Sequence, residues 1–159
     1  MSKIKKFSGL KVTKTSGGKD PIRLVSDFIL NKGFDPEECL EETTSTARRW
    51  MLEVDDERSI EILLEDINKP QETTIYMGVN VATVPVKGLS DFLATVLEVA
   101  DGLIGVKISL VGHFIVMSNS AGIANCTIDD LDWQFMLVME QIPWFTNTLA
   151  SELGIIEED

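Results

Sequence analysis

Residues 48–67, RRWMLEVDDERSIEILLEDI, decide the fold of this chain because their apolar side chains recur at every second position. A period of two places successive side chains on opposite faces of a strand. Residues 55–58, DDER, separate the two runs and have the composition of a turn. The stretch therefore predicts an antiparallel hairpin with one covered face, which carries Trp50, Leu52, Val54, Ile60, Ile62 and Leu64.

Further strands are predicted downstream of this hairpin. Residues 73–84, TTIYMGVNVATV, alternate in the same way, with Ile75, Met77, Val79 and Val81 on one side. Residues 104–122, IGVKISLVGHFIVMSNSAG, predict two strands or one bent strand, with Gly112 near the bend. The acidic stretch before the hairpin, residues 34–45, has the composition of a loop.

Three helices complete the pattern. The first spans residues 20–33, where Asp20 can cap, Pro21 suits the first turn and Gly33 suits the end. The second spans residues 89–103, and its expected core face holds Leu89, Phe92, Leu93, Val96, Leu97, Ala100 and Leu103. The third is expected to run from Thr127 to Leu153, with Asp130 completing a variant capping box.

The element order α-β-β-β-α-β-β-α predicts an α+β domain. We expect an antiparallel sheet of about five strands, with helices packed mainly on one face. Residues 1–19 form a flexible basic arm in this interpretation, and residues 20–159 form a single domain.

The last predicted helix carries two apolar stripes. At about 100° per residue, the first stripe is a core face made of Leu131, Phe135, Val138, Met139, Ile142, Phe145, Leu149 and Leu153. Trp133, Leu137 and Trp144 form a second stripe, which is the candidate protein-contact surface for a twin subunit or a client. The alternative is that the arm or the first helix covers this stripe. Pro143 is expected to kink the helix and decides whether the stripe stays continuous.

The charge distribution narrows the class of partner. Residues 1–19 contain six lysines and no acidic residue, whereas the remaining 140 residues contain all 26 acidic residues against eight basic ones, a net charge of −18. Such a body repels phosphate groups, so neither nucleic acid nor an anionic membrane is expected as a main partner. The arm could stay solvated, contact an anion, or fold back on the acidic body.

Enzyme chemistry has little support in the residues. The sharpest catalytic alternative is a thiol-dependent enzyme that uses Cys126 and the single histidine, His113. A small-molecule sensor with a pocket between sheet and helices is a further alternative. No metal-ligand cluster or phosphate-binding loop is apparent, so no cofactor is expected. Without a signal peptide or a membrane-spanning run, the expected location is the cytoplasm.

Four segments carry a resemblance to a known family: IRLVSDFILNKGF (22–34), RRWMLEV (48–54), LSDFLATVLEVADGLIGVKISL (89–110) and TIDDLDWQFMLVMEQIPWFTNTLASELG (127–154). Their order resembles the YbjN-like family and the related type III secretion chaperone fold over residues 20–153. The resemblance implies a non-enzymatic protein that often dimerises and binds other polypeptides, or has a regulatory part. It carries over no site residues, and the basic arm and acidic loop have no counterpart in it.

Overall fold

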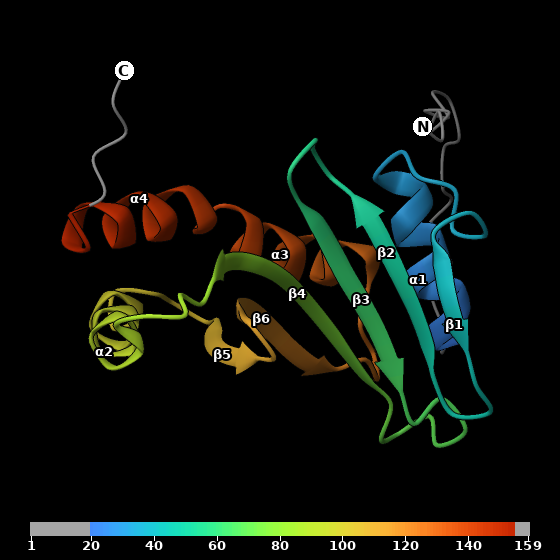
Figure 1. The fold of residues 1–159 in the computed structure, drawn as a ribbon. Coiled ribbons are helices and arrows are strands. Elements are labelled where there is room, and N and C mark those ends of the chain that lie inside the picture. Colours follow the sequence, from blue (N-terminus) through green and yellow to red (C-terminus); the bar gives the residue numbers. More distant parts are fainter. Residues whose placement is uncertain (1–19, 155–159) are drawn as a thin grey trace.

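The computed structural model describes residues 20–154 of the chain (Figure 1), so the predicted basic arm at residues 1–19 lies outside the described residues. The described elements follow one another as α1 (Pro21–Asn31), β1 (Leu40–Thr43), β2 (Arg48–Glu53), β3 (Ser59–Glu65), β4 (Thr74–Thr83), α2 (Leu89–Ala100), β5 (Lys107–Val111), β6 (Phe114–Gly122), α3 (Ile128–Met139) and α4 (Ile142–Glu152).

The strands form a six-stranded sheet in the order β1-β2-β3-β4-β6-β5, and every neighbouring pair is antiparallel. The predicted hairpin is confirmed, because Trp50 pairs with Ile62, which in turn pairs with Met77 of β4. These three side chains form one row and are at most 2 % exposed. The period of two in the sequence thus becomes a single buried sheet face, and the α+β class is confirmed.

One strand lies where the sequence predicted a loop. β1 pairs with β2 although all four of its residues are exposed. Its sequence, LEET, shows no apolar alternation because neither face of this short edge strand is deeply buried. Pairing with β2 therefore decides its structure, and the sheet has six strands where about five were expected. The stretch 104–122 forms two strands, and Gly112 turns between them at φ +58°.

Helices α1 and α3 pack together on the buried face of the sheet. The rings of Phe28 and Phe135 meet edge to face at 5.9 Å, and Lys32 Nζ lies 4.8 Å from the Phe135 ring centroid while it pairs with Asp132. The buried Gln134 donates from Nε2 to the backbone oxygens of Ile75, at 3.3 Å, and Asn119, at 3.2 Å. Gln134 thereby attaches α3 to both β4 and β6.

A bulge in β4 changes the expected strand pattern. Asn80 pairs with Val116 and Ala82 pairs with Ile115, so Val81 is the extra residue. Val81 was expected to face the core beside Ile75, Met77 and Val79, but it is only half-buried because the bulge turns it out of their row. The bulge lies beside α4, where it contributes to a hollow described below.

The predicted core face of α2 was too wide. Phe92, Val96 and Val99 are buried, whereas Leu97 is 70 % exposed and Leu89 is 44 % exposed. Helix α2 packs against α4 and β5, so only a narrow stripe of it can be covered. Leu89, Leu93 and Leu97 recur every four residues and form a ridge at the edge of that stripe. We call these three residues the α2 ridge.

The aromatic contact between α1 and α3 predicts a clear difference between two phenylalanines. Phe28→Ala should lower the free energy of unfolding by about 3–5 kcal/mol because a fully buried ring leaves a cavity. Phe114→Ala, which truncates a ring that is 43 % exposed, should cost less than about 1 kcal/mol. Urea unfolding of both variants measures this difference, and equal losses would contradict the packing described here.

Candidate protein-contact surface

The last predicted helix is two helices, which corrects the expectation of one helix from Thr127 to Leu153. Helix α3 ends at Met139 and α4 begins at Ile142. Pro143 lies in the first turn of α4, where its missing N–H is tolerated because no intrahelical acceptor would be available there. Because Pro143 has no N–H to donate, the Met139 carbonyl lacks its helical hydrogen-bond partner, and the helix is interrupted at this point.

The break is held in place by the side chain of Gln141. Its Nε2 donates to the backbone oxygens of Leu137, at 2.7 Å, and Ile104, at 2.8 Å, and its Oε1 accepts from Ile104 N at 2.8 Å. Ile104 belongs to the loop between α2 and β5. One amide therefore joins this loop to the junction of α3 and α4.

Two glycines let the same loop approach the helices closely. A Cβ placed on Gly105 would lie 2.8 Å from Leu137 Cδ2, and one on Gly102 would lie 2.5 Å from Trp144 Cη2. Gly105 also has φ +67°, which disfavours other residues. Leu137 and Trp144 thus rest on the loop of their own chain.

Trp133 lies one turn before Leu137 and is 69 % exposed, and Ile104 is 75 % exposed. Trp144 is 47 % exposed because the loop shields part of its ring. We call Ile104, Trp133, Leu137 and Trp144 the tryptophan patch. Among residues 20–154 the cover over the predicted stripe is thus partial, and it comes from the α2–β5 loop. The predicted cover by the arm lies outside the described residues. The role of Trp133, Leu137 and Trp144 as a protein contact stays a prediction.

Sequence reasoning missed Ile104 and the bridging role of Gln141. Ile104 stands at the start of a stretch predicted to form strands, and the sequence predicts no role for Gln141. The available signal was the pair of glycines in DGLIGV (residues 101–106), since closely spaced glycines mark a place where another segment approaches the backbone.

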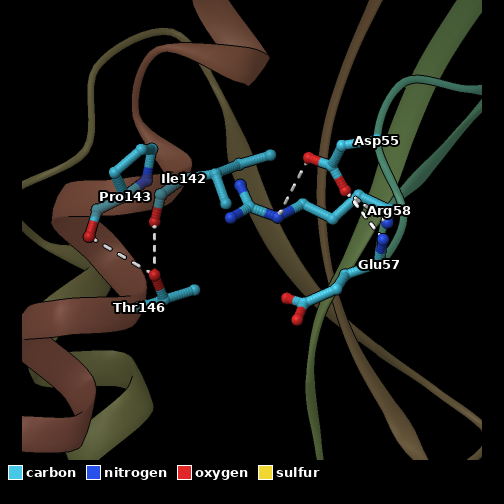
Figure 2. Close-up of polar contacts among 6 residues, drawn as sticks. All are labelled: Asp55, Glu57, Arg58, Ile142, Pro143 and Thr146. Carbon is cyan, nitrogen blue, oxygen red and sulfur yellow. Dashed lines mark hydrogen bonds and ion pairs between the residues drawn. The ribbon is translucent and has the colours of Figure 1, made fainter.

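A hollow of about 700 Å³ lies between the β2–β3 turn, the β4 bulge and α4. In Figure 2 the guanidinium of Arg58 reaches from the turn toward Ile142. Some of the polar groups drawn are bonded to one another: Asp55 accepts from the backbone of Glu57 and Arg58, and the Thr146 hydroxyl donates to the Ile142 carbonyl at 2.9 Å. The lining also includes the polar side chains of Glu57, Asn80, Asn147 and Ser151. The small-molecule sensor therefore stays an alternative prediction.

A second hollow, of about 330 Å³, lies between α2 and α4. Its lining combines the Trp144 indole with three carboxylates and small or apolar groups: Glu98, Val99, Asp101, Gly102, Trp144, Thr148 and Glu152. We call it the acidic groove. It adjoins the tryptophan patch because both include Trp144.

The structure does not bring Cys126 and His113 together. His113 lies in the turn before β6, and Cys126 follows the far end of that strand. Nine residues of strand separate the two ends by roughly 30 Å. Burial, and then the charge of Asp130, raise the pKa of the Cys126 thiol, whereas a nucleophile needs a lowered one.

In residues 20–154, no three His, Cys, Asp or Glu side chains are grouped as metal ligands would be. None of the helices in this range is long and apolar enough to cross a bilayer.

The thiol pKa values predict the pH dependence of alkylation. Burial raises the pKa of both Cys126 and Cys39, and the carboxylates of Asp35 and Glu38 raise that of Cys39 further. Less thiolate is present at neutral pH than in the unfolded chain, so each cysteine should react with iodoacetamide more slowly when folded. Peptide mass spectrometry against pH, with a urea-unfolded control, measures both rates. Faster alkylation of folded Cys126 at neutral pH would revive the enzyme alternative.

Comparison with known proteins gives matches to solved structures. No family model and no curated protein matches the chain. The crystal structure of the ExsC-ExsE complex matches with a TM-score of 0.56 and 13 % identity, over 80 % of this chain and 92 % of that one. The HopA1-SchA chaperone-effector complex has a TM-score of 0.49 and 12 % identity, over 79 % of this chain and 91 % of the other. The ExoU-SpcU complex from the type III secretion system of Pseudomonas aeruginosa has a TM-score of 0.49 and 13 % identity, over 78 % of this chain and 96 % of the other.

At these identities the likeness establishes the fold alone, and the ExsC-ExsE match carries it. The fold expected from the resemblance is therefore confirmed as an architecture, whereas the chaperone role stays a proposal. No match supports the YbjN-like family, so that part of the resemblance stays a prediction. The chain has the α+β architecture of a protein found in the ExsC-ExsE complex.

Proposed function

We propose that this chain is a non-enzymatic protein-binding domain, chaperone-like or regulatory, that contacts its partner through the tryptophan patch. The observation that carries the proposal is the exposure of Trp133, which is 69 %, one helical turn from Leu137. The loop that rests on Leu137 carries Ile104, which is 75 % exposed. Exposed apolar patches mark protein contact sites, and tryptophan is enriched among the residues that dominate binding energy.

The patch is preorganised for contact. Trp133 stands on a helix whose opposite side is buried through Leu131 and Phe135, and Gln141 fixes the loop that carries Ile104. Little side-chain or loop entropy would therefore be lost on binding. Burying the exposed part of one tryptophan contributes about 3 kcal/mol of gross hydrophobic stabilisation.

The matched fold supports the proposal. The ExsC-ExsE structure is a complex of two proteins, which makes protein binding a function that this architecture can support. The acidic body of residues 20–159, with a net charge of −18, favours a client that is neutral or basic over nucleic acid or an anionic membrane.

A homodimer is the second part of the proposal. The α2 ridge is exposed at Leu89 and Leu97, and β5 is an edge strand whose Leu110 is 52 % exposed. An apolar ridge beside an unpaired strand edge suits a two-fold contact between identical surfaces. The twin subunit would then use α2 and β5 and leave the tryptophan patch to the client.

Capture from native lysate tests the client site. Trp133→Ser bait should retain at least about 30-fold less partner than wild-type bait, because a central tryptophan contributes about 2 kcal/mol or more. The matched control is Phe114→Ser, which removes an exposed aromatic ring from β6 and should capture as wild type does. Both variants must keep the wild-type unfolding temperature. Equal capture by all three baits would refute a client site at Trp133.

Light scattering tests the dimer. The wild type should show twice its mass of 17.6 kDa, and Leu97→Glu should show the single mass because a charge would be buried in the α2 contact. Trp133→Ser should remain a dimer. A wild type that is a monomer at every concentration, or a Leu97→Glu variant that stays dimeric, would contradict this arrangement.

A further inference from the structure

We propose that the acidic groove binds the chain's own basic arm, residues 1–19, by seating a lysine ammonium group on the Trp144 indole among Glu98, Asp101 and Glu152. The arm would dock in this way whether or not the tryptophan patch also binds a client. The proposal selects the third possibility that the sequence left open for the arm, which was folding back on the acidic body.

The lining of the groove suits a cation attached to an apolar stem. Trp144 is 47 % exposed, so part of its ring is open for contact, and the rest lies over Gly102. The electron-rich face of an indole attracts an ammonium group more strongly than other aromatic rings do. Glu98 lies in α2, Asp101 directly follows α2, and Glu152 lies at the end of α4. The carboxylates therefore line the groove from both of its helices. The lining contains no basic side chain that would neutralise them.

The arm has the complementary composition. It carries six lysines and no acidic residue, and Ile4, Phe7, Leu10 and Val12 lie among the lysines. Its charged groups match the groove, and its apolar groups match the neighbouring patch, where Ile104 and Trp133 are exposed. The arm is the most basic segment of a chain whose other 140 residues have a net charge of −18.

The arm is long enough to reach the groove within one chain. Nineteen residues span up to roughly 60 Å when extended. The arm precedes α1, which packs on the sheet with α3, whereas α2 lies beyond the other end of the sheet (Figure 1). The groove is lined by residues of α2 and α4. Six neighbouring strands cover about 24 Å from the first to the last. Tethering also holds the arm near the groove at an effective concentration in the millimolar range.

Docking would give the arm a regulatory effect if the proposed client site is correct. An arm in the groove would lie on Trp144, which also belongs to the tryptophan patch, so a client that covers Trp144 would have to displace the arm or bind together with it. The arm would then compete with clients for this part of the surface.

Zero-length carbodiimide crosslinking of the full chain tests the proposal, because it joins lysine ammonium groups to carboxylates in direct contact. Mass spectrometry should find lysines of the arm joined mainly to Glu98, Asp101 and Glu152. Trp144→Leu should reduce these crosslinks at least five-fold, Trp144→Phe should reduce them less, and Phe114→Leu should leave them unchanged. Mixing isotope-labelled and unlabelled chains should show that the crosslinks form within one chain.

Three results would overturn the proposal. The first is crosslinks spread over all exposed carboxylates, including Glu37, Glu38 and Glu41 near β1. The second is an unchanged yield in both Trp144 variants. The third is crosslinks that form only between chains. None of these outcomes bears on client capture, so the arm proposal and the proposed function can fail independently. Circular dichroism of each variant, with the wild-type spectrum as the requirement, excludes loss of folding as the cause of a lost crosslink.

Discussion

The break between α3 and α4 is the constraint on which the candidate contact surfaces of this molecule depend. An unbroken helix over residues 127–153 would be about 40 Å long and would have to follow one line across the sheet. Because Pro143 cannot donate to Met139, α3 stays on the sheet through Gln134 while α4 packs on α2 (Figure 1). Gln141 makes the break rigid by bonding to Leu137 and to both backbone groups of Ile104.

The hollows and the exposed rings all follow from this geometry. Where α4 leaves the sheet, the β4 bulge and the β2–β3 turn remain partly uncovered, and the larger hollow lies there. Where α4 meets α2, Trp144 becomes a wall of the acidic groove. Where the loop meets the junction, it covers Leu137 but not Trp133. One proline and one glutamine thus position an apolar patch beside an acidic groove, which is a combination suited to a polypeptide with both apolar and basic side chains.

Structural features that follow from a short sequence period could be predicted, because each depends on residues that are close together in the sequence. Alternation identified the row of Trp50, Ile62 and Met77, and the helical period identified the buried face that runs from Leu131 to Leu149. The Thr127–Asp130 capping box formed as expected. Strand β1 and the bulge at Val81 were not predictable in the same way, because both arise from pairing with strands that local sequence does not specify.

The candidate site could be predicted only in part, because it also depends on contacts between segments that are distant in the sequence. The second stripe of Trp133, Leu137 and Trp144 could be seen from periodicity, but its cover could not, because Gln141 bonds to a residue 37 positions away. The exposure of Leu97 was also hidden, since periodicity shows that a side of α2 is apolar without showing how much of it α4 and β5 can cover.

The central claim is that the exposed face around Trp133 touches another protein. The most direct test places a photo-crosslinking amino acid at position 133 and, as a control, at position 53, where Glu53 is exposed at the end of β2. Irradiation in native lysate should give a discrete crosslinked partner from position 133 and none from position 53. No crosslink from position 133, or the same products from both positions, would contradict a specific protein contact at this surface.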